Sequence, residues 1–583
     1  MSFPLGSNSP YIVPHIISFF NNILKKVFIL KFLFILLKCK LPPGVDNYGE
    51  VWYTFSVVTI FALTELKYME LKNLGGRKAR MLLVYPDYTD RDCTRRVSGG
   101  NYSEGLASIS AVLKEGGHDV KLLHLLNLHT EVDYKERLLA AGEFDIIGFS
   151  IRTTAFPDCV DYIKWTKEAC PDAFVICGSY HCTLVPDEVL AVDGVDCVCV
   201  GDGEYAELEL CDKMSAGEDY TDVKSLYFKM PDGSIKKNPI RPLFADLDRI
   251  PIPDFELFDY DNLESSKVGT AIVVVSRGCF YNCTYCGNGN FRKVYPNKKI
   301  YARFRSPENA ILYLKTLLSK HPQIKFINFR DAIFNMFPDW FDKFIDMYTK
   351  EIGLPCTGNI RFDILTEETV KKMKEAGFYT IDMGLESGDP EMRFKYLRRY
   401  QTDEMIIRCS QWFHKYGISQ LTYNIIGLPF EDIHRALKTI KLNARIRSDR
   451  TIPNIFYPYE GTALYEISKE AGFIPEGDLT KRRVPLVQPQ FPEEQVLFVE
   501  AYFMHFVKRY KRAYAMPKWL GEPYEKWLDK RVTGKYVPYK FYVKLHDIYA
   551  AVRNKLKDIL VNRMPKLYVK LRMLKHKKRA EGK

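Results

Sequence analysis

Three cysteines on one short loop constrain this chain more than any other feature of its sequence. Cys279, Cys283 and Cys286 lie between Ser276 and Arg292, separated by three residues and then by two. A structural zinc ion takes four protein ligands, and an iron–sulfur cluster is normally held by four cysteines, so this trio is one ligand short. The spacing therefore predicts a cubane iron–sulfur cluster with one iron left open to another ligand.

The segment before the loop places these cysteines at the end of a strand. The apolar run 271–275 directly precedes the loop and predicts a β-strand. Parallel α/β folds keep their functional sites at the carboxyl ends of their strands. This context favours a functional loop over a partial zinc knuckle or three unrelated thiols.

The cysteine spacing, with the aromatic residue Tyr285 just before the last cysteine, closely resembles the signature of radical S-adenosylmethionine (SAM) enzymes. The resemblance implies that Cys279, Cys283 and Cys286 hold a [4Fe–4S] cluster and that Tyr285 contacts SAM. It also implies that the open iron binds the amino and carboxylate groups of SAM. An electron from the cluster would then cleave SAM to a deoxyadenosyl radical.

Length and composition indicate a globular protein with several domains. The chain has 583 residues, of which 46% are hydrophobic and 14% aromatic, and this length is enough for several full cores. Its 14 cysteines would suit disulfides in a secreted protein, but no convincing cleavable secretory signal is visible. We therefore expect a reducing, cytoplasmic location, with membrane association as the alternative.

The formal net charge of +12 is concentrated at the two ends of the chain. Residues 508–583 contain 23 lysines and arginines against 6 acidic residues, and residues 1–80 contain 10 against 4. The segment 81–507 between them is acidic. Nucleic acid binding needs a basic groove, so we expect no nucleic acid ligand for this central body.

The first 68 residues form an apolar extension that is poorly suited to span a membrane. The run 27–37 has only 11 residues and contains Lys31, whereas a spanning helix needs about 20 mostly apolar residues. Two interpretations stay open. The extension is an interfacial anchor, or the reading frame is over-extended and the protein starts at Met69 or Met81.

From Met81 onward the pattern changes to alternating strands and helices. Helical stretches such as 103–116 separate five apolar runs that predict strands, at 81–85, 120–123, 145–150, 173–177 and 196–200. Apolar strands joined by crossover helices predict a Rossmann-like, doubly wound parallel sheet over 81–214. Its ligand crevice would lie at the carboxyl ends of the strands.

The residues after these strands resemble the cobalamin-binding domain that precedes many radical SAM domains. The matching elements are 105–120, Gly-Phe-Ser at 148–150, Gly-Ser-Tyr-His-Cys-Thr at 178–183 and Gly-Asp-Gly-Glu at 201–204. Glycine in such loops lets the backbone approach a bulky ligand closely. The resemblance implies that cobalamin is contacted by Ser150, Thr153, Gly178, Ser179, Gly201, Gly203 and Glu204.

One element of other cobalamin proteins is missing from this chain. The loop 86–100 contains no histidine, so the Asp-x-His-x-x-Gly motif that supplies a lower cobalt ligand is absent. The resemblance then implies cobalamin held without a histidine ligand, as is usual in the radical SAM branch. For His118 and His181 we expect structural or pocket-lining roles.

A linker and a second α/β series follow the first sheet. Residues 215–268 are rich in Asp, Pro and Lys and predict a short hairpin and a stiff linker. Within 269–480, strand-like runs recur at 271–275, 324–329, 355–360, 379–385, 420–426 and 451–457. Six strand–helix units predict a partial (β/α)6 TIM barrel, the radical SAM domain, rather than a full barrel of eight units.

Polar residues at the ends of these strands match landmarks of the radical SAM family. Asp331 follows the second strand of the series and Arg361 follows the third. Glu386 and Ser387 follow the fourth, in a Gly-Leu-Glu-Ser sequence that resembles the family's Gly-x-Glu-Ser element. The resemblance implies that these four side chains orient SAM.

Two further elements appear in the order that the family places them. Gly427 opens Gly-Leu-Pro-Phe-Glu-Asp, which carries Phe430 where the family usually has glycine. The turn Pro-Tyr-Glu-Gly-Thr at 458–462 matches the element near the end of the family's domain. The resemblance covers roughly residues 81–475 and implies that Gly427 also lies at the SAM site.

The remainder, 481–583, is basic, rich in aromatic residues and expected to be mainly helical. Leu545, Ile548, Val552, Leu556 and Ile559 recur at helical spacing with basic residues between them. We expect this apolar stripe to pack on the barrel. The alternative is a basic helix at a membrane surface, attracted by anionic lipid, which would give peripheral membrane contact.

These features favour a cobalamin-dependent radical SAM methyltransferase that methylates an unactivated carbon. A rival within the same architecture is oxidative ring formation without methyl transfer, as in the anaerobic cyclase of chlorophyll synthesis. A non-catalytic sensor that binds cobalamin or SAM is a third alternative, disfavoured because nothing in the cluster loop is missing. The implied partners are a small-molecule or lipid-like substrate, which the sequence does not identify, and an electron donor such as flavodoxin or ferredoxin.

Overall fold

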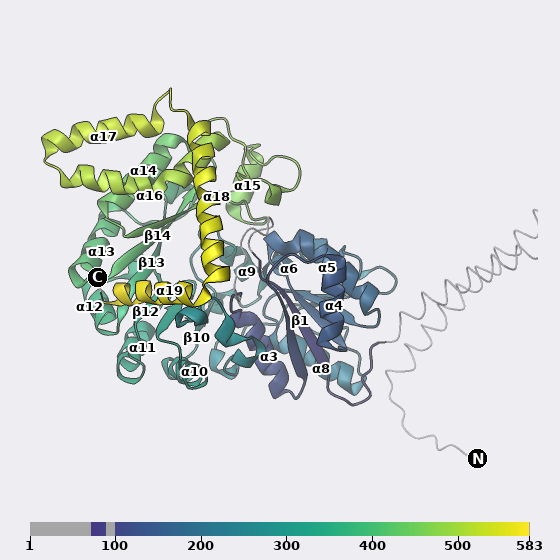
Figure 1. Ribbon diagram of the computed structural model, residues 1–583. Coiled ribbons are helices and arrows are strands. Elements are labelled where there is room, and N and C mark those ends of the chain that lie inside the picture. The colour runs from purple at the N-terminus through teal and green to yellow at the C-terminus, as the bar shows by residue number, and fades with distance from the viewer. Residues whose placement is uncertain (1–70, 89–99, 582–583) are drawn as a thin grey trace, which may run out of the picture. The chain divides into compact units, whose positions relative to one another are not determined.

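The first large sheet has seven strands and comes first in the described chain. The computed structural model describes residues 71–88 and 100–581, so the predictions for residues 1–68 fall outside it. Figure 1 shows this sheet, marked by β1, with helices on both sides. The strand order is β2-β1-β3-β4-β5-β6-β7. The strands are β1 (Arg80–Pro86), β2 (Asp119–Leu125), β3 (Ile146–Ser150), β4 (Phe174–Gly178), β5 (Cys197–Cys199), β6 (Leu226–Lys229) and β7 (Ile235–Lys237).

Alternate residues of the central strand β1 face opposite sides of this sheet. Met81 and Leu83 join one buried cluster with α3 and α8, whereas Leu82 and Val84 join another with α4, α5 and α7. Strands buried on both faces are typical of doubly wound sheets, which confirms the predicted fold class. The helices are α3 (Glu104–Glu115), α4 (Glu131–Ala141), α5 (Phe156–Ala169), α6 (Tyr180–Leu184), α7 (Pro186–Leu190) and α8 (Glu204–Ala216).

The hairpin expected in the linker extends the first sheet. Strands β1 to β5 are parallel, but β6 pairs antiparallel with β5, and β7 pairs antiparallel with β6. The sequence predicted five strands for this sheet and a separate hairpin in the linker, because the edge strand β7 reads Ile-Lys-Lys and gives no apolar signal that would join the hairpin to the sheet. Short 3-10 turns complete the linker at Leu247–Arg249, Phe255–Leu257, Tyr260–Asn262 and Ser266–Val268.

The second large sheet is a curled half-barrel of six parallel strands. Its order, β15-β14-β13-β12-β11-β8, follows the sequence, and every neighbouring pair is parallel. The predicted partial barrel is therefore confirmed. The strands are β8 (Thr270–Val273), β11 (Phe326–Phe329), β12 (Cys356–Ile360), β13 (Phe378–Glu386), β14 (Ser419–Ile426) and β15 (Arg450–Ile455). The helices between and after them are α10 (Pro307–Lys320), α11 (Pro338–Glu351), α12 (Glu367–Glu375), α13 (Asp403–Tyr416), α14 (Ile433–Arg445) and α15 (Ala463–Glu470).

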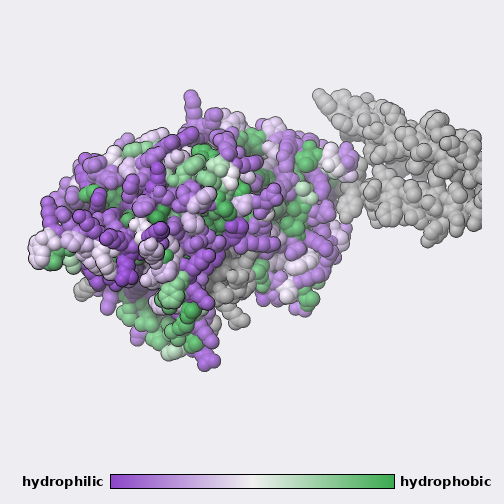
Figure 2. Space-filling model, turned by 90° about the horizontal axis from the view of Figure 1, so that it is seen from above, coloured by the Kyte–Doolittle hydropathy of each residue, from purple (hydrophilic) through white to green (hydrophobic). Residues whose placement is uncertain are grey.

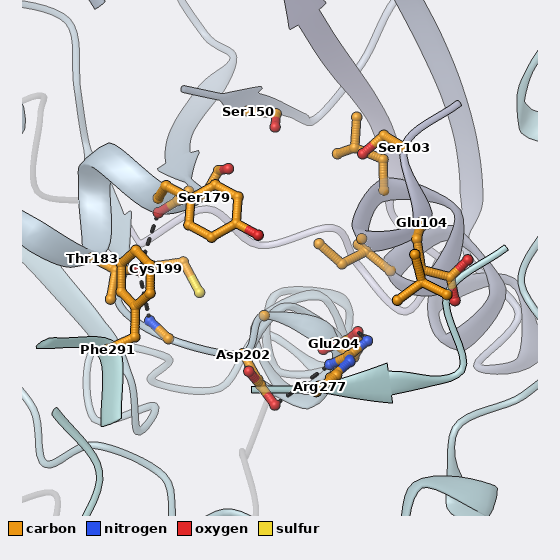
Figure 3. Close-up of a pocket in the computed structure, with 18 of the residues that line it drawn as sticks. Ser103, Glu104, Ser150, Ser179, Thr183, Cys199, Asp202, Glu204, Arg277 and Phe291 are labelled. Carbon is orange, nitrogen blue, oxygen red and sulfur yellow. Dashed lines mark hydrogen bonds and ion pairs between the residues drawn. The ribbon is translucent and has the colours of Figure 1, made fainter. Parts of the chain in front are cut away.

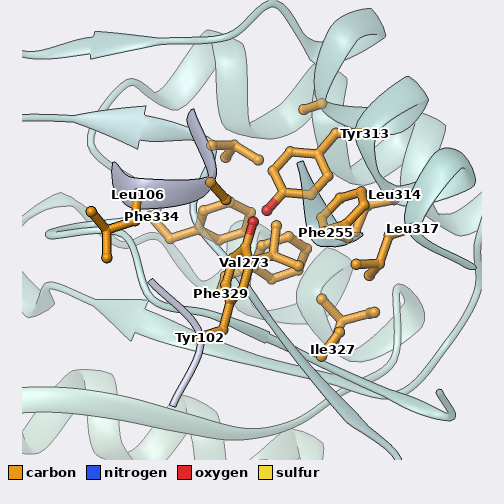
Figure 4. Packing of buried hydrophobic residues seen from close by; sticks show 14 of the residues in the cluster. Tyr102, Leu106, Phe255, Val273, Tyr313, Leu314, Leu317, Ile327, Phe329 and Phe334 are labelled. Carbon is orange, nitrogen blue, oxygen red and sulfur yellow. The ribbon is translucent and has the colours of Figure 1, made fainter. Parts of the chain in front are cut away.

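A continuous aromatic core joins the two sheets. Figure 4 shows Tyr102, which precedes α3, packed among Phe255 of the linker and Phe329 of β11. The hydroxyl group of Tyr313, on α10, donates a hydrogen bond of 2.8 Å to Glu104 of α3. This shared core fixes the carboxyl ends of the first sheet relative to those of the half-barrel.

Four helices form the carboxyl-terminal region, as expected, but the apolar stripe on one of them does not pack on the barrel. Leu545, Ile548, Val552, Leu556 and Ile559 of α18 are each between 43% and 63% exposed. The expectation that they are buried is therefore wrong, because the opposite side of α18 makes the packing contacts. Hydrophobic surface is visible among hydrophilic surface in Figure 2. The helices are α16 (Glu493–Ala515), α17 (Lys518–Thr533), α18 (Tyr539–Arg563) and α19 (Pro565–Ala580).

Within residues 71–88 and 100–581, no helix combines the length and apolar content that crossing a membrane requires.

Candidate active site

The loop that carries the three cysteines leaves a short strand and is shaped by one glycine. It runs from β9 (Ser276–Arg277), which pairs with β10 (Arg303–Phe304), to α9 (Asn288–Val294). Gly278 has a φ of +78°, and a Cβ there would lie 2.3 Å from the carbonyl oxygen of Tyr301. Only glycine fits this turn. The loop borders a cavity of about 470 Å³, whose lining includes Cys279, Cys283 and Cys286.

Burial disfavours the thiolate forms of Cys279 and Cys286, whereas two arginines place positive charge beside Cys283. Burial raises the pKa of the Cys279 thiol to about 11 and also raises the pKa of Cys286. The Cys283 sulfur accepts hydrogen bonds from Arg361 Nη1 at 4.0 Å and from Arg399 Nη1 at 3.9 Å. Buried thiolates need nearby positive charge, which a metal cluster supplies and these two guanidinium groups increase.

The arrangement of the thiols fits a cluster better than a single metal ion. Across residues 71–88 and 100–581, no three His, Cys, Asp or Glu side chains converge as a single ion requires. The three cysteines instead surround a shared volume, and no fourth cysteine of the described chain lines it. This donor set fits a [4Fe–4S] cluster with one iron open.

Glu386 forms a wall of the same cavity from the end of β13. Its φ is +63°, which is uncommon for a residue that carries a Cβ. Its Oε1 accepts a hydrogen bond of 3.0 Å from the hydroxyl group of Tyr285, and Arg399 Nη1 lies 3.7 Å from the same oxygen. Burial raises the pKa of Glu386, and Arg399 opposes that rise. The three side chains make one connected polar surface.

Arg361 forms a second part of the wall and is held before any ligand binds. Its guanidinium group donates hydrogen bonds of 2.8 Å and 2.9 Å to the two carboxylate oxygens of Asp363. The same group lies 3.5 Å from the ring centre of Tyr281. Because both contacts restrict its rotamers, Arg361 stays beside Cys283.

Arg399 was not predicted from the sequence, although this arginine contacts more of the site than any of the predicted side chains does. Besides Cys283 and Glu386, Arg399 donates hydrogen bonds to the Tyr285 hydroxyl at 3.1 Å, to Gln401 at 3.2 Å and to the carbonyl oxygen of Gly384. It lies in an irregular segment after β13, where no motif marks an arginine. Its only sequence signal is its position shortly after the Gly-Leu-Glu-Ser element.

Asp331 supports the cluster loop rather than lining the cavity. It is fully buried, and its Oδ1 accepts hydrogen bonds from Val275 N at 2.9 Å and from the hydroxyl group of Ser276. Burial raises its pKa to about 6. Since Ser276 lies three residues before the first cysteine, Asp331 fixes the start of the loop.

Ser387 and Gly427 also lie outside the lining of this cavity. The Ser387 hydroxyl accepts a hydrogen bond of 3.2 Å from Asp389 N, so it shapes the turn after β13. Gly427, with a φ of +80°, donates its N–H to Glu431 Oε2 at 2.7 Å. Both residues therefore hold the turns that end β13 and β14.

A second cavity, of about 610 Å³, lies at the carboxyl ends of the first sheet. Figure 3 shows its polar residues arranged around a common space. Thr153, at the start of a 3-10 turn (Thr153–Ala155), lies outside the lining. The other residues implied as cobalamin contacts all line it: Ser150, Gly178, Ser179, Gly201, Gly203 and Glu204.

The surface of this second cavity leaves room and hydroxyl groups for a bulky ligand. A Cβ at Gly178 would meet only ordinary contact with Cys199, at 3.7 Å, so the protein's own packing does not require glycine there. Ser103 and Ser179 precede α3 and α6, but neither side chain caps its helix. Ser179 has a φ of +86°. The absence of a side chain at Gly178, and the hydroxyl groups of Ser103 and Ser179 that cap no helix, fit the polar rim of a corrin ring.

None of the described residues that line the second cavity is a histidine. His118 Nδ1 accepts a hydrogen bond of 3.1 Å from Ala79 N, and its Nε2 lies 3.1 Å from Asp212. His181 lies 4.3 Å from Phe156 between ring centres, and burial lowers its pKa to about 4. Both histidines have structural contacts away from the cavity.

Arg277 joins the cluster loop to the first sheet. It lies one residue before Gly278, and in Figure 3 its guanidinium group points at Asp202 and Glu204. It forms an ion pair with Glu204 and lies 3.4 Å from Asp202 Oδ2, which also pairs with Arg303 at 2.9 Å. Arg277 was not predicted as a site residue, and Asp202 was included only as part of the Gly-Asp-Gly-Glu element, because nothing local in the sequence reveals this pairing.

The two cavities share part of their walls. Three residues line both of them: Asn288, Arg330 and Ala332. The cluster cysteines and the strand ends of the first sheet therefore face adjoining spaces.

Two family models match the chain. The radical SAM superfamily model matches residues 273–442, and the B12 binding domain model matches residues 94–211. The first range contains the cluster loop and Glu386, and the second contains most of the strand ends that line the larger cavity.

Two relatives and a solved structure are similar to this chain. The "Uncharacterized methyltransferase PH0819" of Pyrococcus horikoshii is 29% identical over 390 residues, covering 66% of this chain and 82% of that protein. The anaerobic magnesium-protoporphyrin IX monomethyl ester cyclase of Rubrivivax gelatinosus is 23% identical over 397 residues, covering 66% of this chain and 69% of the cyclase. The radical SAM methyltransferase TsrM from Kitasatospora setae is similar in fold, with a TM-score of 0.56 at 16% identity over 70% of this chain and 82% of TsrM.

The family matches and the geometry agree on the cofactors. Radical SAM domains use a [4Fe–4S] cluster and SAM, and the chemistry of the three cysteines and the polar wall fits these two groups. B12-binding domains use cobalamin, for which the larger cavity provides the space. The chain is a radical SAM enzyme in which a B12-binding domain precedes the radical SAM domain.

Proposed function

We propose that this enzyme is a cobalamin-dependent methyltransferase that methylates an unactivated carbon of a small-molecule or lipid-like substrate. The observation that carries the proposal is the wall shared by the two cavities, formed by Asn288, Arg330 and Ala332. A substrate held at this wall faces the cluster loop on one side and the B12-binding domain on the other. Such a position suits a reaction that needs both cofactors at one carbon.

In this proposal the cofactors carry the difficult chemistry and the chain positions them. When bound, the cluster supplies the electron that cleaves SAM to methionine and a deoxyadenosyl radical, and cobalamin supplies the methyl group. Cys279, Cys283 and Cys286 are the cluster ligands. Arg399 contacts Tyr285, Glu386 and Cys283 at once and so holds the first two beside the cysteine. This buried network would orient SAM beside the cluster.

Glu386 would bind the positively charged amino group of SAM. Burial raises the pKa of its carboxyl group, and a cation beside it favours the ionised form and offsets that rise. Arg361, which is held by Asp363, would face the SAM carboxylate. Asp331, Ser387 and Gly427 would act indirectly, by holding the cluster loop and the turns after β13 and β14.

The larger cavity would hold cobalamin through main-chain approach and short side chains. Gly178 leaves space for the corrin ring, Gly201 and Gly203 bring the main chain to the cavity wall, and Ser150 and Ser179 offer hydroxyl groups to the amide side chains of the ring. Glu204 is held by Arg277, so it would shape the floor of the cavity. No described histidine lines this space, which supports binding without a histidine ligand to cobalt.

A second candidate function is oxidative ring formation without methyl transfer. The similarity to the Rubrivivax gelatinosus cyclase, 23% identical over 66% of this chain, favours it. The similarity to the protein from Pyrococcus horikoshii that is named a methyltransferase is higher, at 29% over the same share of this chain. The two reactions differ in the products left from SAM.

The test is anaerobic reconstitution with iron, sulfide and hydroxocobalamin, followed by spectra and product analysis with SAM and a strong reductant. Methyl transfer is expected to give both S-adenosylhomocysteine and deoxyadenosine. Ring formation gives deoxyadenosine without S-adenosylhomocysteine. A protein that binds no corrinoid would rule out the methyltransferase proposal, and a colourless protein that leaves SAM intact would rule out both reactions.

The proposed reaction also needs an external electron for each cleavage of SAM. A flavodoxin or ferredoxin is the proposed donor, in a reducing cytoplasm that keeps the cysteines available to iron. Replacing the chemical reductant with a reduced flavodoxin should support SAM cleavage. A protein that turns over only with the chemical reductant would require another donor.

A further inference from the structure

The apolar stripe of α18 is longer than the sequence analysis proposed, and all of it faces solvent. Each member is between 43% and 63% exposed. At about 100° per residue, members three or four positions apart fall on one side of a helix. The stripe consists of Phe541, Leu545, Ile548, Tyr549, Val552, Leu556 and Ile559.

The other side of α18 attaches the helix to the protein. Val543 is 9% exposed and joins the buried cluster of α14, α16 and α17. Asp547 forms an ion pair of 2.9 Å with Arg483, and the carbonyl oxygen of Tyr542 accepts a hydrogen bond from Tyr502 of α16. The helix is therefore fixed with its apolar side outward, rather than loosely placed.

Helix α19 repeats this division. Leu567, Leu571 and Leu574 are between 38% and 49% exposed, at helical spacing. The opposite side contacts the half-barrel and the linker: the His576 ring lies 5.4 Å from that of Phe326 in β11, and Arg572 pairs with Glu264 of the linker at 3.3 Å. Two consecutive helices therefore present leucine-rich sides to solvent.

Basic residues border both apolar sides. Residues 539–581 contain thirteen lysines and arginines against three acidic residues. Two of those three acids are already paired, Asp547 with Arg483 and Glu581 with Lys577. The remaining positive charge is available to an outside partner, and it includes Lys544, Lys555 and Lys557 within α18.

We propose that α18 and α19 form a docking surface for an anionic lipid bilayer. A helix with an apolar side and lysines along its edges lies in the plane of a membrane interface, its apolar side about 5–10 Å deep among the headgroups. The lysine side chains extend along the apolar surface to reach lipid phosphates. A second copy of this surface is disfavoured as the partner, because two strongly basic surfaces repel each other.

Vesicle co-sedimentation of the reconstituted full-length enzyme tests the proposal. We expect binding to phosphatidylcholine vesicles that contain about 30% phosphatidylserine, little binding to phosphatidylcholine alone, and release in about 0.5 M salt. The variant Leu545→Glu/Val552→Glu/Leu556→Glu should lose at least about tenfold in vesicle affinity, because each buried apolar side chain contributes roughly 1.5 kcal/mol or more. The matched control, Val132→Glu/Leu139→Glu, changes apolar residues of α4 that are 67% and 58% exposed, and it should bind as the unchanged enzyme does.

A local probe separates this surface from any other lipid-binding part of the chain. Val552→Trp places an indole in the stripe, and brominated lipid in the vesicles should quench the added fluorescence. Val132→Trp should show no added quenching. Cluster absorbance and SAM cleavage should stay unchanged in all variants, which establishes that they fold.

Three outcomes would overturn the proposal. The first is an indole in the stripe that brominated lipid does not quench. The second is a triple variant that binds vesicles as tightly as the unchanged enzyme. The third is a concentration-dependent dimer, seen by sedimentation velocity and broken by the triple variant, with no binding to either kind of vesicle.

Discussion

The two cavities of this enzyme are bounded by different kinds of residue. The larger one is bounded at its strand ends by glycines and short hydroxyl side chains, such as Gly178 and Ser179, and only on another side by the ion-paired Arg277 and Glu204. The smaller one is bounded by long side chains already bonded to one another, with Arg399 joining Tyr285, Glu386 and Cys283. The strand ends of the first cavity offer space, whereas the wall beside the cysteines in the second offers prearranged charge.

This difference suggests how each cavity recognises its cofactor. A large rigid ring needs room and main-chain contact, and glycine provides both. A small zwitterion beside a metal needs fixed charges in a dry site, where they act strongly because water does not screen them. Changes in the first cavity should therefore affect affinity, and changes in the second should affect catalysis.

The largest expected effect comes from removing a cluster ligand. Cys283→Ala should abolish cluster absorbance and SAM cleavage, because two thiolates do not hold a [4Fe–4S] cluster. Cobalamin affinity should stay unchanged if the two cavities act separately. Iron content, SAM cleavage and corrinoid binding measure the three effects. Cys170→Ala, at a partly exposed cysteine of the first domain, is the control, and cleavage that survives Cys283→Ala would contradict the assignment.

Removing Arg399 should have the next largest effect. Arg399→Met leaves Glu386 and Tyr285 buried without their cationic partner, which should lower the free energy of unfolding by about 3 kcal/mol. The rate of SAM cleavage should fall by about a hundredfold, because SAM is then poorly oriented. Denaturant unfolding and deoxyadenosine formation measure the two. Arg408→Met removes an exposed arginine of α13 as the control, and equal effects at both positions would show that Arg399 has no special role.

Filling the larger cavity should affect binding alone. Gly178→Val adds bulk where a Cβ meets only Cys199 at 3.7 Å, so the protein should fold normally while cobalamin loses space. We expect at least about a tenfold loss of cobalamin affinity, which corresponds to roughly 1.4 kcal/mol, and a smaller loss for Gly178→Ala. Titration with hydroxocobalamin measures the affinity. A concurrent loss of SAM cleavage would contradict the division between the cavities.

The smallest expected effect on catalysis is at Glu431, which holds the turn at Gly427 and should influence stability alone. Burial raises its pKa to about 8, above the value of about 4.3 in an unfolded chain. The protonated form is therefore favoured by folding, and its contribution is full below about pH 4 and lost as the pH rises through about 8. As the pH rises from 5 to 9, the melting temperature of Glu431→Gln should therefore rise relative to that of the unchanged enzyme. Glu466→Gln, at an exposed position, should show no such trend, and neither should Glu431→Gln if its pKa is ordinary.

Main-chain features of this enzyme could be predicted from the sequence. Most parallel strands of the two sheets appear as apolar runs because they are buried, and their order fixes where each strand ends. Gly178, Gly201 and Ser150 were therefore predicted to lie at one edge, where they line a common cavity. The cysteine loop was predicted because its ligands are close together in sequence.

Side chains that reach across the structure could not be predicted in the same way. Arg399 and Arg277 make their contacts with groups that are far away in sequence, and no local pattern marks them. Asp331 and Gly427 were placed next to SAM because of their motifs, yet their contacts are with the loop and turn that they hold.

The apolar stripe of α18 shows another limit of sequence patterns. Helical spacing identified the side on which Leu545 and Val552 lie, but not whether that side faces the protein or solvent. The decision depends on the remaining contacts of the helix, such as that of Asp547 with Arg483. The pattern is the same for a packed helix and for an exposed one.

Two of the described cavity residues that carry a side chain are held in a left-handed backbone conformation, Ser179 with a φ of +86° and Glu386 with a φ of +63°. Glycine at either position would relieve a strain of roughly 1 kcal/mol or more. Selection for heat resistance alone would therefore favour glycine at both, at the expense of a hydroxyl group in one cavity and a carboxylate in the other. An engineering effort that ranks variants by melting temperature should exclude these two positions from its library.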